Sequence, residues 1–79
     1  MNSPTFLLLT LELLNLDYND LSGAIPSELG GLNRLEMLKL NANELRGRIP
    51  GQVCDLTFFS LQELFVDCKQ VFCTCCNNC

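Results

Sequence analysis

The chain has 79 residues, a formal net charge of −4 and no histidine. The negative charge opposes binding to nucleic acid or to an anionic membrane surface, because either partner would repel it. Without histidine, the chain lacks the commonest general base and the commonest metal ligand. The composition is 48% hydrophobic, which excludes a disordered chain, and the length leaves room for one small domain.

The N-terminal segment contains a short apolar stretch, Phe6–Leu9. No Lys or Arg precedes it, Glu12 follows it, and no small-residue cleavage site is visible, so we expect no signal peptide here. Every unbroken apolar run is far shorter than the roughly 18 residues that a membrane-spanning helix needs, so we expect no membrane insertion. Residues 1–10 are predicted to be the remainder of a partial upstream repeat.

An internal repeat organises most of the chain, because a shift of 24 residues superposes the sequence on itself. The matching residues of the first copy are Leu8, Leu11, Leu14, Leu16, Asn19, Leu21, Gly23, Ile25 and Pro26. Those of the second copy are Leu32, Leu35, Leu38, Leu40, Asn43, Leu45, Gly47, Ile49 and Pro50. Leucines alone would match by chance at this density, but the ordered Asn, Gly and Pro would not.

Each part of the repeat has a physical interpretation. The pairs Leu14/Leu16 and Leu38/Leu40 alternate with polar residues and predict short strands with inward-facing leucines. Asn19 and Asn43 follow the strands and are predicted to form a structural ladder, in which a buried amide bonds the backbone of its own turn and of the next repeat. The glycines suit a tight bend, and the Ile-Pro pairs predict an extended segment behind the strand.

The segment Leu11–Leu32, LELLNLDYNDLSGAIPSELGGL, resembles the plant-type leucine-rich repeat, L-x-x-L-x-L-x-x-N-x-L-x-G-x-I-P-x-x-L-G-x-L. The second copy, Leu35–Leu56, departs from this pattern only at Val53 and Cys54, where the family has Leu and Gly. The resemblance implies an α/β solenoid, a right-handed coil with a short parallel sheet on its concave face. Proteins of this family are extracellular, many are receptor-like, and they bind peptides or proteins on that face.

A third copy begins but is degenerate. Leu61, Leu64 and Val66 match the second copy with a shift of 26, so two residues have been added in the Thr57–Ser60 region. Lys69 stands where the ladder Asn belongs, which predicts that stacking ends there. We therefore expect a partial repeat over 1–10, leucine-rich repeats over 11–34 and 35–58, and a degenerate last repeat with a cysteine-rich C-terminal cap over 59–79. The chain is expected to be a fragment of a longer array.

Six cysteines lie in the C-terminal part of the chain: Cys54, Cys68, Cys73, Cys75, Cys76 and Cys79. An even number in a small chain with an extracellular type of repeat favours disulfides, in a pairing that the sequence does not choose. The adjacent Cys75 and Cys76 are not expected to bridge each other. The alternative is a zinc–thiolate site with Cys76-x-x-Cys79 as one half and either the cramped Cys73-x-Cys75 or Cys54 with Cys68 as the other. In the disulfide interpretation, we expect no metal and no cofactor.

The predicted binding surface is the concave face of the strands. Side chains alternate between the two faces of a strand, and this alternation places on the concave face the candidate residues Asn15, Asp17, Met37, Lys39, Asn41, Glu63, Phe65 and Asp67. Leu13 lies on the same face, and Tyr18 and Ala42 lie at its edge. The exposed aromatics Tyr18 and Phe65 favour an interface. The alternative is a solvated sheet face without a ligand.

The sequence contains no Ser-His-Asp set, Cys-His pair, phosphate loop or kinase motif, so we expect no enzymatic activity. The favoured function is a protein- or peptide-binding module of a secreted or cell-surface protein. The alternatives are a structural capping fragment of a longer array and a zinc–thiolate module. Two and a half repeats without an N-terminal cap also predict self-association through the open N-terminal edge.

Overall fold

The computed structural model describes residues 10–79. The partial repeat expected over 1–10 therefore lies, except for Thr10, outside the described residues. The elements in chain order are β1 (Leu13–Asn15), β2 (Ser22–Gly23), η1 (Ser27–Gly31), β3 (Met37–Lys39), β4 (Glu44–Leu45), β5 (Gly47–Arg48), α2 (Gly51–Asp55), η2 (Leu56–Phe58), β6 (Glu63–Phe65) and β7 (Val71–Phe72).

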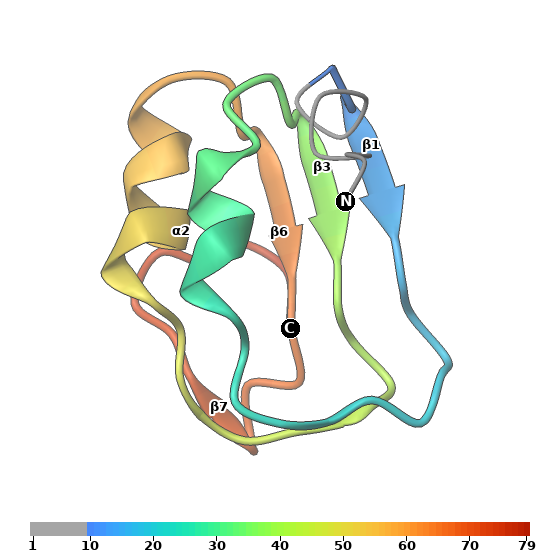
Figure 1. Cartoon of the computed structure of the whole chain (residues 1–79). Coiled ribbons are helices and arrows are strands. Elements are labelled where there is room, and N and C mark those ends of the chain that lie inside the picture. The colour runs from blue at the N-terminus through green and yellow to red at the C-terminus, as the bar shows by residue number, and fades with distance from the viewer. Residues whose placement is uncertain (1–9) are drawn as a thin grey trace.

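Three parallel strands, β1, β3 and β6, form one layer of the molecule (Figure 1). Leu13 pairs with Met37, a separation of 24 residues, and Met37 pairs with Glu63, a separation of 26. These registers confirm both the repeat and the two-residue insertion before its third copy. The helical segments η1, α2 and η2 lie together in a second layer, away from the strands (Figure 1).

The hydrophobic core fills the space between the two layers. Leu38 and Leu64 point inward from the middle of their strands and are 0% and 1% exposed. The inward leucines Leu14, in β1, and Leu16, just after it, are only partly buried and pack against the edge of this core. The alternation predicted for the strands is therefore present, and burial increases from the first strand to the next two.

The helical segments η1 and α2 each begin directly after a proline. Pro26 (φ −68°, ψ 134°) and Pro50 (φ −62°, ψ 140°) are extended and precede η1 and α2. The two segments pack closely at Gly30, where a Cβ atom would lie 2.5 Å from the Cβ of Gln52. This contact explains the glycine at that position of the repeat, because any side chain would collide with the next repeat.

The C-terminal tail, residues 71–79, contacts the preceding part of the fold in two places. Its strand β7 pairs with β5 in a separate two-stranded sheet, and Val71 is 2% exposed. Farther along, Asn78 forms an isolated parallel bridge with Phe65 at the edge of β6. The tail thus supplies the terminal layer of the stack, where the sequence pattern of the repeat has been lost.

Candidate functional site

The predicted binding residues of the three strands lie in register on one face of the sheet. We call this the sheet face; its residues are Leu13, Asn15, Met37, Lys39, Glu63 and Phe65. One row across the strands is Leu13, Met37 and Glu63, and the next is Asn15, Lys39 and Phe65. Leu13 is 62% exposed, which leaves a large apolar side chain in contact with solvent.

Lys39 and Phe65 interact within the second row. The Nζ atom of Lys39 lies 5.0 Å from the centroid of the Phe65 ring, within the range of a cation–π contact. Both side chains are partly buried, whereas Asn15 and Glu63 beside them are exposed. The contact holds an aromatic ring and a positive charge in a defined position on an otherwise solvated face.

A third row, Asp17, Asn41 and Asp67, follows the strands and has a structural part. The two carboxylate oxygens of Asp67 accept the backbone N–H groups of Ala42 (2.9 Å) and Asn43 (3.2 Å). The Asn41 Oδ1 atom is buried without a hydrogen-bond partner among the described residues. Asp67 therefore bonds the backbone of the turn that follows β3 in the neighbouring repeat. Its place in the sequence did not predict this role.

Tyr18 and Ala42 occupy equivalent turns after β1 and β3. Their φ angles are 56° and 58°, so both residues adopt the left-handed conformation. The Tyr18 side chain is 79% exposed, which places the ring in solvent beside the third row. A non-glycine residue in this conformation is uncommon. Because the conformation recurs at the same position of two repeats, we attribute it to the way the repeats stack.

The ladder asparagines are unequal in the structure. The Nδ2 group of Asn43 donates to the carbonyls of Leu16 (2.9 Å) and Leu40 (3.1 Å), and its Oδ1 accepts the Leu21 N–H at 3.1 Å. It therefore bonds its own repeat and the preceding one. Asn19 is exposed and donates to the carbonyls of Leu16 and Asp17, within its own repeat.

Beyond Lys69, the ladder is replaced by residues of the tail. The Oδ1 atom of Asn77 accepts the Leu64 N–H at 3.0 Å, and its Nδ2 donates to the Gln62 carbonyl at 2.7 Å. The Val66 N–H donates to the Asn78 carbonyl at 3.2 Å. Sequence reasoning missed both asparagines, because they lie outside the repeat and only their position between cysteines distinguished them.

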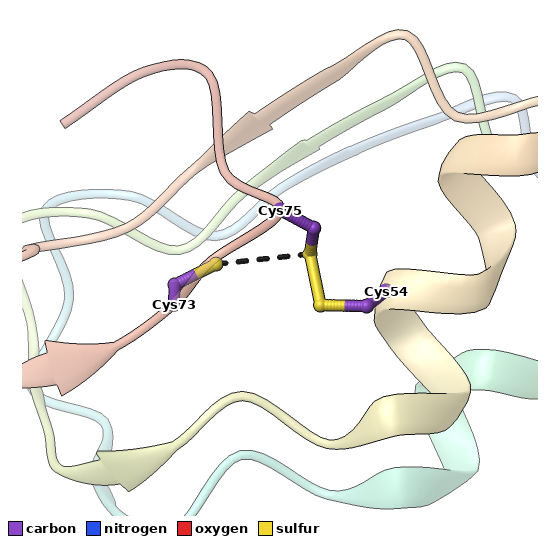
Figure 2. Close-up of side chains that lie close together, drawn as sticks. All are labelled: Cys54, Cys73 and Cys75. Atoms are coloured by element: carbon purple, nitrogen blue, oxygen red, sulfur yellow. Dashed lines mark hydrogen bonds between the residues drawn. A yellow bond between two sulfur atoms is a disulfide. The ribbon is translucent and has the colours of Figure 1, made fainter.

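All six cysteines form disulfides, as expected. Cys54 pairs with Cys75, Cys68 with Cys79, and Cys73 with Cys76. Cys54 and Cys68 are thus both tied to the tail. The adjacent Cys75 and Cys76 belong to different bridges, and Figure 2 shows the Cys54–Cys75 bridge. The proposed zinc half-site Cys76-x-x-Cys79 is divided between two bridges, which corrects that alternative.

Cys54 stands at the position where the first repeat has Gly30. Gly30 is pressed against the next helical segment, whereas Cys54 lies beside the tail and reaches it through its disulfide. The departure from the repeat pattern therefore has a structural cause. At the end of the stack, the neighbouring helix is absent from the described residues and a covalent link to the tail takes its place.

The comparisons with known proteins agree with this architecture. Residues 10–32 match the Leucine Rich Repeat family. No curated protein and no solved structure gives a match. Within residues 10–79, no helix is long and apolar enough to cross a membrane, and three disulfides are typical of extracellular proteins. The family match at residues 10–32 and the parallel strands in register together support a leucine-rich repeat architecture for the described residues.

Proposed function

We propose that the chain is a non-enzymatic module that binds a protein or peptide on the sheet face. The observation that carries the proposal is the register of β1, β3 and β6, which aligns six side chains of different chemistry on one surface. Regular strands hold these side chains at fixed spacings, about 4.8 Å between neighbouring strands. Such spacing suits a ligand that contacts several strands at once.

The chemistry of the face suits a polypeptide ligand. Leu13 and Met37 offer apolar surface, Asn15 offers an amide, and Glu63 and Lys39 offer charges of both signs. Interfaces combine apolar and aromatic contacts with a few oriented polar groups. The Lys39–Phe65 pair is the best candidate for an anchor, because its aromatic ring is partly buried and already positioned.

The proposal also covers the larger architecture of the module and the compartment in which it acts. The repeats 11–34 and 35–58 and the capped region 59–79 would form the end of a right-handed solenoid, with the sheet face on its concave side. The three disulfides support secretion or display at the cell surface, because such bonds persist in oxidising compartments. The match to the family over residues 10–32 supports the protein-binding role in general terms.

The test uses a phage-displayed library of random peptides, selected against the oxidised chain. Selected peptides should bind Phe65→Ala about fivefold or more weakly than the wild type, because truncation of an interface aromatic costs more than about 1 kcal/mol. The matched control is Phe58→Ala, since Phe58 lies in η2 and is 80% exposed. Peptides that lose the same affinity for both variants would contradict the assignment of the face.

A second candidate is a structural capping segment without a ligand of its own. It is favoured by the tail, which covers the last repeat through β7 and the Asn78 bridge. Failure of the library to yield any peptide that binds the sheet face would favour this candidate over the binding module.

A further inference from the structure

Two of the three disulfides lie against each other. The Cys73 Sγ atom is 3.8 Å from the Cys75 Sγ atom, although the two belong to different bridges. The Sγ atoms of Cys54, Cys73 and Cys75 all lie within 4.8 Å of one another (Figure 2). The fourth sulfur, that of Cys76, is bonded to Cys73. Four cysteines from α2 and the tail thus converge on one place in the molecule.

One non-bonded sulfur pair in this cluster has the spacing found in a metal–thiolate centre. In a tetrahedral zinc site with a Zn–S bond of about 2.3 Å, neighbouring sulfurs are about 3.8 Å apart. Cys73 and Cys75 already have this separation. The Cα atoms of each bridged pair are 5.7 Å apart, so side-chain rotation alone can separate two sulfurs once their bond is broken.

We propose that reduction of the Cys54–Cys75 and Cys73–Cys76 bridges converts this cluster into a binding site for one zinc ion. A dithiol reductant supplies two electrons and two protons to each bridge and becomes a disulfide itself. A phosphine supplies the two electrons and becomes the phosphine oxide with the oxygen of water, whose two protons complete the two thiols. Zinc then binds the four sulfurs and releases four protons, because the ligands are thiolates. The oxidised and the zinc-bound forms are mutually exclusive, and this inference is independent of any ligand on the sheet face.

The surroundings support a closed structural site. All four cysteines are partly buried, which limits access of water to the ion. Arg48 lines the same hollow as Cys54 and can offset the net negative charge of a zinc ion with four thiolates. Because Cys54 belongs to α2 and the other three to the tail, the ion would connect the same two parts of the fold that the disulfides connect.

The test compares three double variants, each of which lacks one bridge. The fully reduced wild type is titrated with Zn²⁺ against a chromophoric chelator, and with Co²⁺, whose thiolate absorption reports the number of sulfur ligands. Wild type and Cys68→Ser/Cys79→Ser should bind one zinc ion per chain with equal affinity, because the Cys68–Cys79 bridge is outside the cluster. Cys54→Ser/Cys75→Ser and Cys73→Ser/Cys76→Ser should bind at least about a hundredfold more weakly, since even outer partners of a metal site change affinity by about 10–100-fold.

The three variants lose the same number of thiols, so non-specific binding by cysteines would affect them alike. Equal affinities across the three, or loss of zinc from the Cys68→Ser/Cys79→Ser variant, would overturn the proposal. So would a reduced wild type that binds less than one zinc ion per chain. Circular dichroism of each reduced sample with and without zinc provides a second readout, in which zinc should increase the order of wild type and of the Cys68→Ser/Cys79→Ser variant alone.

Discussion

The Asp67 carboxylate accepts the backbone N–H of Asn43 at 3.2 Å, and the Asn43 side chain bonds in turn to the backbone of Leu16 and Leu21 in the preceding repeat. Each of the two side chains thus bonds the backbone of the repeat that precedes its own. Asn43 is 8% exposed and is the buried polar residue of the described core. Three successive layers are therefore connected through two polar side chains.

Replacement of Asn43 by Ala should lower the free energy of unfolding by about 1–3 kcal/mol, because the Leu40 carbonyl and the Leu21 N–H lose their bonds to the Asn43 side chain and the Leu16 carbonyl loses one of its two donors. Asn19→Ala should cost less, since Asn19 is exposed and bonds only its own repeat among the described residues. Urea unfolding of the two variants measures the difference. Equal losses would show that Asn43 does not connect the repeats.

Asp67→Ala should also destabilise the protein, by about 1–3 kcal/mol, because two backbone N–H groups lose a charged acceptor. Lys69→Ala is the control, since Lys69 is exposed and occupies the position where the repeat pattern would place an asparagine. Thermal unfolding of both variants should show a lower Tm for Asp67→Ala alone. A loss confined to Lys69→Ala would mean that the ladder runs through position 69 after all.

Gly30→Ala should destabilise by about 1–3 kcal/mol, because the added Cβ would lie 2.5 Å from the Gln52 Cβ and 2.7 Å from the Gln52 carbonyl carbon. The neighbouring Gly31 has open space around it, so Gly31→Ala should be neutral or slightly stabilising. Chemical denaturation of this pair compares the same substitution at adjacent residues. A harmless Gly30→Ala would place the two helical segments farther apart than we describe.

The disulfides should contribute unequally to stability. In the chain-entropy model, the Cys54–Cys75 bridge, with a sequence separation of 21, contributes about 3 kcal/mol, and the Cys73–Cys76 bridge, with a separation of 3, contributes about 2 kcal/mol. We expect a reductant to lower the Tm of the oxidised protein and a chelator to leave it unchanged. A Tm that falls with the chelator alone would show that the protein holds a metal before any reduction.

The sequence was sufficient to predict the repeat, because the strand positions are encoded by leucines at a fixed spacing. It also predicted that Leu38 and Leu40 point inward, and the observed exposures of 0% and 3% confirm this. The predicted disulfides are present, and both Cys54 and Cys68 are linked to the tail. These features depend on local pattern or on composition, which a single sequence contains.

The terminal layer could not be predicted in the same way. Asn77 and Asn78 bond the edge of β6 from outside the repeat, so no periodicity indicates their position. Likewise, the role of Asp67 depends on how closely the second and third repeats approach. The pairing of the cysteines depends on the path of the tail, because six cysteines allow fifteen pairings and their spacing does not discriminate among them.

Native-state hydrogen exchange tests the central claim, that stacked repeats end in a layer formed by the tail. Three amides occupy equivalent positions: Leu16 donates to Lys39, Leu40 to Phe65, and Val66 to Asn78. In the oxidised protein, Leu40 and Val66 should exchange slowly and Leu16 faster, because among residues 10–79 β1 is the edge strand that the tail does not cover. After reduction without metal, Val66 should lose its protection before Leu40 does. Protection of Val66 that is unchanged by reduction, or Leu16 as slow as Leu40 in the oxidised protein, would contradict this account.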